Sequence, residues 1–348
     1  MRFPGRIALA ALLMAAAVSC TKETKPDPSL TKETAFRYVI IPYALSTANA
    51  NYNSLADNAE QLKDACLLMK ERQASESLTG AEIQNACKLW KACRENWLRS
   101  LSLPVFAAED GALRSAIGSS PADTAAIRVL IDGGIFDIAS SADNLKGLSA
   151  AEYLLFQTDG EKSENHGVEY STAELDYLCD VASELQEKTR ALYTLWAGSG
   201  EGNSSYSYEL LNCSAEGSRY LTYQEALLEL IDAFTEATEY LGKTMIGVEV
   251  SPLSLNSVED YKSVFNGIKS CYEGKISGQA SISSYVKSID SELDSKVRSL
   301  LTECQKTLTN LKEPLSATPA EDMEKARTKI GTELSAAFSE VHEFIAGI

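Results

Sequence analysis

Apolar residues recur at intervals of three and four along most of this chain, which is the spacing that places them on one face of an α-helix. One such stripe consists of Leu55, Ala59, Leu62, Cys66 and Met69. No stretch combines period-two alternation with the turn residues of a β-hairpin. Amphipathic helices joined by short loops pack as up-and-down bundles, so the sequence predicts an all-α fold built of helical bundles.

Capping residues predict where several of these helices begin. The patterns T-x-x-E at Thr79–Glu82 and S-x-x-E at Ser171–Glu174 are typical capping boxes. Thr318–Pro319 precede the last apolar stripe and suit an N-cap followed by the first helical position. One long helix is predicted over residues 282–311, and Pro42 is expected to kink or break the first helix.

Residues 199–219 are the best candidate linker between two halves of the chain, because Gly, Ser, Asn and Tyr dominate there. We therefore expect an N-terminal helical subdomain over residues 35–198 and a C-terminal helical subdomain over residues 220–348. About four principal helices are expected in each. No clear sequence repeat relates the two halves.

The N-terminus resembles a bacterial lipoprotein signal. Two arginines precede the short apolar run Ile7–Val18, and small residues lead directly into Cys20. The run is too short for a comfortable membrane span. We expect residues 1–19 to be a signal peptide, Cys20 to be lipidated, and residues 20–34 to be a tether. The protein would then belong to the bacterial cell envelope, held to a membrane by lipid alone. A plain secretory signal with a chance cysteine is the alternative.

Charge argues against one class of partner. The formal net charge is −17, whereas a nucleic-acid-binding surface needs a basic stripe. No nucleic-acid partner is therefore expected.

The cysteines argue for buried thiols rather than a disulfide framework. Most of them occupy apolar positions of helical stripes, where cysteine behaves as a small hydrophobe, and their spacing does not suit zinc. Those beyond the lipidation site are odd in number, so they cannot all pair within one chain: Cys66, Cys87, Cys93, Cys179, Cys213, Cys271 and Cys304.

One acidic residue interrupts an apolar helix face. The segment KGLSAAEYLLFQ, residues 146–157, places four apolar residues on the same helical face as Glu152. A carboxylate in such a stripe is costly unless it is paired, protonated or bound to a metal. Ser149 precedes Glu152 by three residues and is its neighbour on the helix.

A second charge, Arg94, interrupts an apolar stripe between Trp90 and Trp97. Its guanidinium is a candidate counter-charge for Glu152. Two alternatives stay open, namely a purely structural ion pair and an arginine that stacks on the rings while its head stays in water.

Few residues are available for catalysis or metal binding by histidine, because the chain holds only two histidines. His342 lies in the last helical segment and is interpreted as part of a solvated face. The pattern H-x-x-E at His166–Glu169 is interpreted as a chance match in a surface loop. No phosphate-binding loop, EF-hand or HExxH pattern is present.

Three segments together resemble the signature regions of the imelysin family, which includes insulin-cleaving membrane peptidases and imelysin-like lipoproteins. They are KGLSAAEYLLF with Gly147 and Glu152, LWKACRENWLRS with Trp90, Arg94 and Trp97, and EVSPLSLNSVED with Glu249, Ser254, Asn256 and Asp260. The resemblance spans roughly residues 35–345. It implies an all-α fold of two bundle-like subdomains with a site between them.

The chain departs from the family pattern where function is concerned. Ser149 and Val250 stand at the two positions that typically hold histidine. A serine hydroxyl is a poor ligand for a transition metal compared with imidazole, so the family's peptidase activity is a weak guide. Some relatives are linked instead to iron uptake, a role that needs binding without bond cleavage.

We therefore expect a non-catalytic binding module whose inter-subdomain cleft takes an unidentified ligand or an envelope partner protein. A metal-dependent peptidase and a structural or partner-docking lipoprotein are the alternatives. No cofactor follows from the sequence, and Glu152 and Glu249 are weak candidate ligands for a divalent metal. The expected cleft residues are Trp90, Arg94, Trp97, Gly147, Ser149, Glu152, Glu249, Ser254, Asn256 and Asp260.

Overall fold

The computed structural model describes residues 31–106, 108–157, 160–161, 170–199 and 205–348. Within these ranges the regular structure is helical apart from one short antiparallel hairpin of β1 (Phe156–Gln157) and β2 (Gly160–Glu161). The predicted all-α class is therefore confirmed. The signal peptide, Cys20 and the H-x-x-E pattern lie outside the described residues. None of the described helices combines the length and hydrophobicity needed to cross a bilayer.

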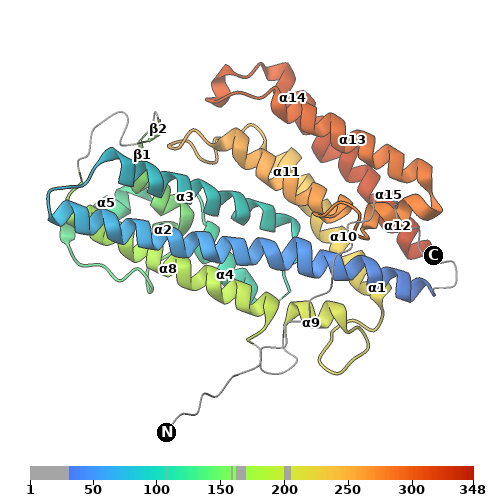
Figure 1. Ribbon diagram of the computed structural model, residues 1–348. Helices are drawn as coiled ribbons and strands as arrows, with labels where there is room; N and C mark the ends of the chain where they lie inside the picture. Colours follow the sequence, from blue (N-terminus) through green and yellow to red (C-terminus); the bar gives the residue numbers. More distant parts are fainter. Residues whose placement is uncertain (1–30, 107, 158–159, 162–169, 200–204) are drawn as a thin grey trace, which may run out of the picture.

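A first group of helices occupies one end of the elongated molecule (Figure 1). In it α2 packs along both α3 and α8, while α4 and α6 pack against α8. The group comprises α2 (Ala50–Ala74), α3 (Gly80–Arg99), α4 (Ala108–Gly118), α5 (Thr124–Gly133), α6 (Gly147–Leu155) and α8 (Thr172–Ala197). Short 3-10 turns, η2 (Ser100–Ser102) and η3 (Asp143–Leu145), follow α3 and precede α6.

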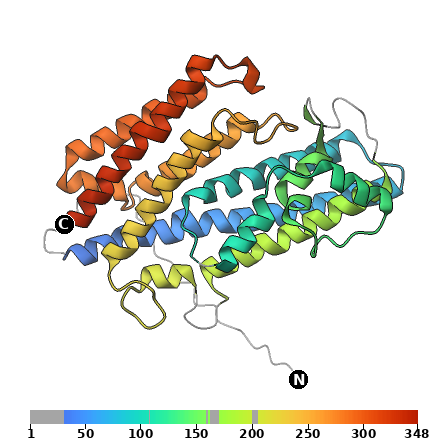
Figure 2. The same cartoon turned by 180° about the vertical axis from the view of Figure 1, so that it is seen from behind.

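A second group forms the other end, and Figure 2 shows it from behind. Here α10 packs against α11 and α15, and α13 packs against α11, α12 and α15. The group comprises α10 (Tyr223–Tyr240), α11 (Ser257–Glu273), α12 (Ile282–Ile289), α13 (Ser291–Thr309), α14 (Ala320–Thr328) and α15 (Ser335–Gly347). A 3-10 turn, η5 (Leu315–Ala317), separates α13 from α14.

The first helix joins the two groups. α1 (Lys32–Pro42) packs on α10 and α12 of the second group, and the chain then continues into α2 of the first group. Figures 1 and 2 show α1 and α2 as one long rod along the molecule. The predicted linker region contains a short helix, α9 (Tyr206–Leu211). The division into subdomains at residues 198 and 220 stays a prediction.

Three π-helical segments widen helices within the described chain: η1 (Tyr43–Asn49), η4 (Leu241–Met245) and η6 (Lys329–Leu334). The expected break at Pro42 is wrong, because the chain passes from the proline directly into η1 and stays helical. The other two segments pack against each other where Gly242 faces Gly331, and a Cβ on Gly242 would overlap the backbone of Gly331.

The predicted capping boxes are confirmed at two helix starts. At α3 and at α8 the N-cap hydroxyl and the third-residue glutamate satisfy each other's backbone groups. A further box at Thr222 and Glu225 opens α10 in the same way. Local sequence alone decides these starts, because both partners lie within one turn.

Two other boundary predictions are wrong. Residues 282–311 form two helices, because Asp290 leaves the helical conformation and its carboxylate accepts hydrogen bonds from the backbone of Glu292 and Leu293 at the start of α13. Thr318 is not the N-cap of α14. Pro319 takes that position, and the Thr318 hydroxyl instead accepts a hydrogen bond from the Lys312 N–H at 2.8 Å.

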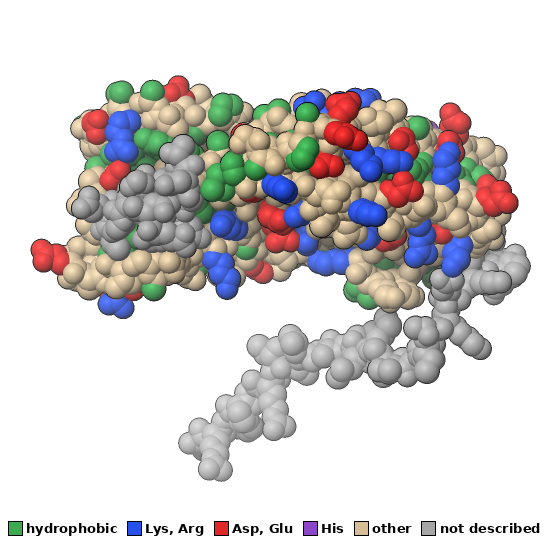
Figure 3. Space-filling view, turned by 90° about the horizontal axis from the view of Figure 1, so that it is seen from above, with side chains coloured by type: hydrophobic (Ala, Val, Ile, Leu, Met, Phe, Trp, Pro, Cys, Tyr) green, Lys and Arg blue, Asp and Glu red, His purple; other side chains and the backbone are tan. Residues whose placement is uncertain are grey.

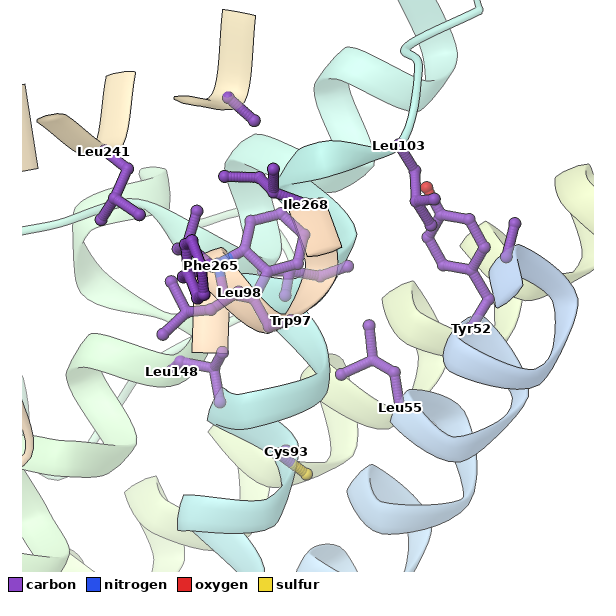
Figure 4. Close-up of a cluster of buried hydrophobic side chains, with 14 of the residues drawn as sticks. Tyr52, Leu55, Cys93, Trp97, Leu98, Leu103, Leu148, Leu241, Phe265 and Ile268 are labelled. Atoms are coloured by element: carbon purple, nitrogen blue, oxygen red, sulfur yellow. The ribbon is translucent and has the colours of Figure 1, made fainter. Parts of the chain in front are cut away.

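The hydrophobic core runs without interruption between the two groups (Figure 4). Trp97 and Leu98 of α3 lie beside Phe265 and Ile268 of α11. The backbones cross closely here, since a Cβ on Gly267 of α11 would lie 2.5 Å from a carbonyl oxygen of α3. This crossing sets how α11 lies against α3.

The seven described cysteines form no disulfide, and all but Cys213 are buried, as their stripe positions predicted.

On the outside, Lys and Arg side chains are interspersed with Asp and Glu on the face seen in Figure 3, which shows no basic stripe.

Candidate functional site

A loop of residues 246–256 connects η4 to α11 and is held by several hydrogen bonds. The Tyr261 hydroxyl donates to the Val248 carbonyl at 2.6 Å and accepts from the Gly247 N–H at 3.2 Å. The Asn256 N–H donates to the Ser251 carbonyl at 3.2 Å, and Leu255 is held at φ 50°. A non-glycine residue in this conformation is uncommon, so the loop is strongly constrained by its surroundings.

Arg94 of α3 pairs with Asp260 of α11 beneath this loop. Nη2 and Nε of Arg94 lie 2.9 and 3.0 Å from Oδ2 of Asp260, and both side chains are buried. Asp260 also accepts hydrogen bonds from the Ser251 hydroxyl at 2.5 Å and the Asn256 amide at 2.8 Å. The expected pairing of Arg94 with Glu152 is therefore wrong, and Asp260 is the direct partner.

Glu152 of α6 reaches the same loop through Ser254. One carboxylate oxygen accepts from the Ser254 N–H at 3.0 Å and from its hydroxyl at 2.8 Å. Burial raises the pKa of Glu152 above its ordinary value of 4.5, while the bonds from Ser254 and the nearby charge of Arg94 act in the opposite direction. Ser149, on the same helix, is also buried. Glu152 thus ties α6 to the loop.

The raised pKa of Glu152 gives a testable pH dependence. A carboxyl whose pKa is higher in the folded than in the unfolded state stabilises the fold below the unfolded pKa, and this stabilisation is lost as pH rises through the folded pKa. Glu152→Gln keeps an acceptor oxygen for Ser254 but removes the titration. As pH rises from below 4.5 through the raised pKa of Glu152, urea denaturation should therefore show the wild-type chain losing unfolding free energy relative to the Gln variant. Glu216→Gln, on the exposed surface, is the control, and a constant difference between wild type and Glu152→Gln would contradict this expectation.

Two further carboxylates anchor the loop and α11 to the turn after α13. Glu249 accepts from the Leu315 N–H at 2.9 Å and from the Ser257 hydroxyl at 3.2 Å. Glu313 accepts from the Val258 N–H at the start of α11. Burial, together with the nearby charges of Glu249 and Asp260, raises the pKa of Glu313. Sequence reasoning missed Glu313, because it stands in a polar turn with no apolar stripe around it.

An open cleft of about 950 Å³ lies beside this network, between the C-terminal half of α3 with the segment that follows it and the α10–η4 wall. Of the expected cleft residues, Arg94, Trp97 and Glu249 line it. Arg114 of α4 also lines it, bonded to Asp110 at 2.8 Å and lying 5.9 Å from the Trp97 ring. The sequence did not single out Arg114.

The remaining expected residues lie outside the lining. Trp90 is a core residue whose indole N–H donates to the Leu148 carbonyl at 2.8 Å. Gly147 touches the end of α4, where a Cβ would lie 2.5 Å from the carbonyl oxygens of Ala116 and Ile117. The other five, which belong to the buried network or its helices, are Ser149, Glu152, Ser254, Asn256 and Asp260.

The sequence matches a known protein family over most of its length. The family model for imelysin matches residues 48–341, which is most of the sequence. The chain belongs to the imelysin family. Its three sequence segments thus meet at one place in the fold, with Arg94, Glu152 and Asp260 contributed by α3, α6 and α11.

Solved structures agree on the fold. A protein from Parabacteroides distasonis assigned as an iron-regulated protein A precursor is 22% identical, with a TM-score of 0.78 over 91% of this chain and 96% of that chain. An imelysin-like protein from Psychrobacter arcticum is 12% identical, with a TM-score of 0.71 over 92% of this chain and 98% of that chain. No curated protein matches the sequence significantly.

The donor set does not fit a metal site at the imelysin motif. Ser149 and Val250 stand where the resemblance places histidines. Glu152 and Asp260 are already engaged by Ser254 and by Arg94 with Ser251. Across the described ranges no three His, Cys, Asp or Glu side chains converge in a way that could hold a metal ion. The suggestion of Glu152 and Glu249 as ligands therefore gains no support from this geometry.

Proposed function

We propose that this imelysin-family chain is a non-catalytic binding module that takes its ligand in the cleft between α3 and α10. The observation that carries the proposal is the contrast between two neighbouring places. The motif carboxylates are buried and hydrogen-bonded within the protein, whereas the adjacent cleft offers about 950 Å³ of open space. That volume lies near the upper end of the range of volumes found for small-ligand pockets.

The buried network has the features of a structural tie rather than of a reaction centre. A general base needs an accessible lone pair within reach of a substrate proton. Glu152 is 4% exposed and Asp260 is 0% exposed, and neither borders the cleft. Arg94, which does border it, is neutralised by Asp260. The network would therefore shape the floor of the cleft and leave recognition to other side chains.

The cellular setting belongs to the same proposal. The lipobox-like N-terminus ending at Cys20 supports a lipid-anchored protein of the bacterial cell envelope. The similar protein from Parabacteroides distasonis is assigned as iron-regulated, which supports a place for this module in an iron-related system.

Filling the cleft tests the proposal. Ala233 of α10 lines the cleft, so Ala233→Trp should occupy ligand space without entering the core. Non-denaturing mass spectrometry of the natively purified protein should show a bound molecule that the variant loses. Ala74→Trp, at the exposed end of α2, is the matched control and should keep the molecule. If both variants carry the same bound molecule as the wild type, the cleft is not the binding site.

The peptidase alternative has its own readout. Incubation with unfolded casein, with and without added divalent metals, should leave the casein intact. Cleavage that is abolished by a chelator would contradict the non-catalytic assignment and would favour a metal-dependent peptidase.

A further inference from the structure

We propose that the cleft selects an amphipathic organic cation, a small molecule with two or more amino groups separated by an apolar chain. This inference rests on the proposed function, because it names the ligand class of the same cleft. It follows from the charge on one wall, the apolar character of the other, and the distances along α10.

The α10 wall presents carboxylates at helical spacing. Glu229, Asp232 and Glu236 all line the cleft, and they stand three and four residues apart on one edge of the helix. The rise between them is roughly 4.5 and 6 Å, so more than one cationic group can be met at once. The opposite face of α10 is buried in the core, which fixes the direction of this edge.

The charge of the cleft is not balanced from within. Both arginines of the lining are already paired, Arg94 with Asp260 and Arg114 with Asp110. In the part of the chain that the structure describes, Glu229 and Glu236 form no ion pair. Glu229 interacts with the Tyr220 hydroxyl and with the charge of Arg219, but Arg219 is itself paired with Glu209 at 2.7 Å. Asp232 is 3.4 Å from His342, which carries charge only when protonated. The excess charge is therefore negative, and it favours a cation.

The wall opposite α10 is mainly apolar and partly open to solvent, apart from Arg94 and Arg114, whose charges are paired with Asp260 and Asp110. Leu101, Leu103 and Pro104 form part of it. Val105 on this wall is 54% exposed, and on the side of α10 and η4 the apolar side chains of Tyr240 and Val248 are 47% and 50% exposed. When exposed apolar side chains gather at one cleft, an apolar part of a ligand can pack against them and be shielded from water. A bare metal ion or a fully hydrophilic cation would leave this wall unused.

The probe for the test is 1,12-diaminododecane, which has a charged amine at each end of an apolar chain. Isothermal titration calorimetry should show saturable binding, and tryptophan fluorescence should report it, because Trp97 lines the cleft whereas Trp90 and Trp196 do not. Dodecanedioate has the same length with the opposite charge and should not bind. Spermine is a polycation with shorter apolar stretches and should bind more weakly.

Two triple variants, matched in net charge, test whether the carboxylates of α10 supply the negative charge that binds the diamine. Glu229→Gln, Asp232→Asn and Glu236→Gln together should weaken diaminododecane binding by about tenfold, which corresponds to about 1.4 kcal/mol. Glu216→Gln, Glu292→Gln and Glu321→Gln change the net charge equally on exposed surface away from the cleft, and affinity should stay within about twofold. Urea denaturation should confirm that both triple variants are folded.

Several results would overturn the inference. Equal binding of dodecanedioate would remove the charge preference, and equal binding of spermine would remove the role of the apolar wall. Equal affinities of the two triple variants would mean that α10 does not supply the charge. Tighter binding of an alternating Lys-Leu peptide than of the diamine would replace the small molecule by a peptide.

The proposed function and this inference fail in different ways. If diaminododecane does not bind, but Ala233→Trp removes a co-purified molecule, the cleft is a binding site for another ligand class and only the inference falls. If the diamine does not bind and Ala233→Trp has no effect on bound material, both fall.

Discussion

Arg94→Met is expected to lower the free energy of unfolding by about 3–5 kcal/mol, because it leaves the charge of Asp260 buried without a counter-ion. Asp260 is 0% exposed and lies 2.9 Å from the guanidinium that would be removed. The hydrogen bonds from Ser251 and Asn256 would remain, but neither donor carries a positive charge. Urea denaturation followed by circular dichroism measures the loss.

Two controls separate burial from the mere loss of an ion pair. Arg128→Met breaks the partly exposed pair with Glu174 and should cost about 1 kcal/mol or less. The double variant Arg94→Met with Asp260→Asn should recover part of the stability, because the asparagine removes the stranded charge and keeps hydrogen-bonding atoms. A loss below about 1 kcal/mol for Arg94→Met would show that the pair is not buried as described.

The sequence identified the right charged residues but not their pairing. Arg94 and Glu152 stood out because they interrupt apolar stripes, and both are buried in the structure. Asp260 was named only through the resemblance to the imelysin family, and its pairing with Arg94 was not predicted, because an acid in the first turn of a helix is ordinarily a solvated partner of the helix dipole. Its burial results from the crossing of α11 over α3 at Gly267, a tertiary contact that no local pattern encodes.

Some helix boundaries are likewise set by residues within one turn of the helix, whereas others are set by contacts with distant parts of the chain. The starts of α3 and α8 were predictable, since each capping box is complete within one turn. The π-helical segments η4 and η6 were not, because they adjust two separate helices to each other where Gly242 meets Gly331. A cleft between the two helical groups was expected, and Arg94, Trp97 and Glu249 do line it, but its α10 wall was not predicted. The acids of α10 interrupt no apolar stripe, and only the folded chain places the mainly apolar wall of α3 and its following segment opposite them.

Gly147→Ala is expected to destabilise the protein by about 3–4 kcal/mol through two separate effects. Gly147 begins α6 with φ 71°, a conformation that costs a non-glycine residue about 1–2 kcal/mol. An added Cβ would also lie 2.5 Å from the carbonyl oxygens of Ala116 and Ile117, which belong to the backbone of α4 and cannot move aside as a flexible side chain could. α4 or α6 would have to shift, and α6 carries Glu152 into its bond with Ser254.

Two other glycines in the same region separate these effects. Gly134 has φ 68° with nothing within 4 Å of a Cβ, so Gly134→Ala should show the backbone cost alone, about 1–2 kcal/mol. Gly111 lies inside α4 with open space around it, and Gly111→Ala should be stabilising by about 0.5–1 kcal/mol, because alanine is the better helix former. Urea denaturation of the three variants should therefore rank them Gly111, Gly134, Gly147 in order of increasing loss. If Gly147→Ala costs no more than Gly134→Ala, the close approach of α6 to α4 contributes nothing, and the glycine of the imelysin motif is required for its backbone conformation alone.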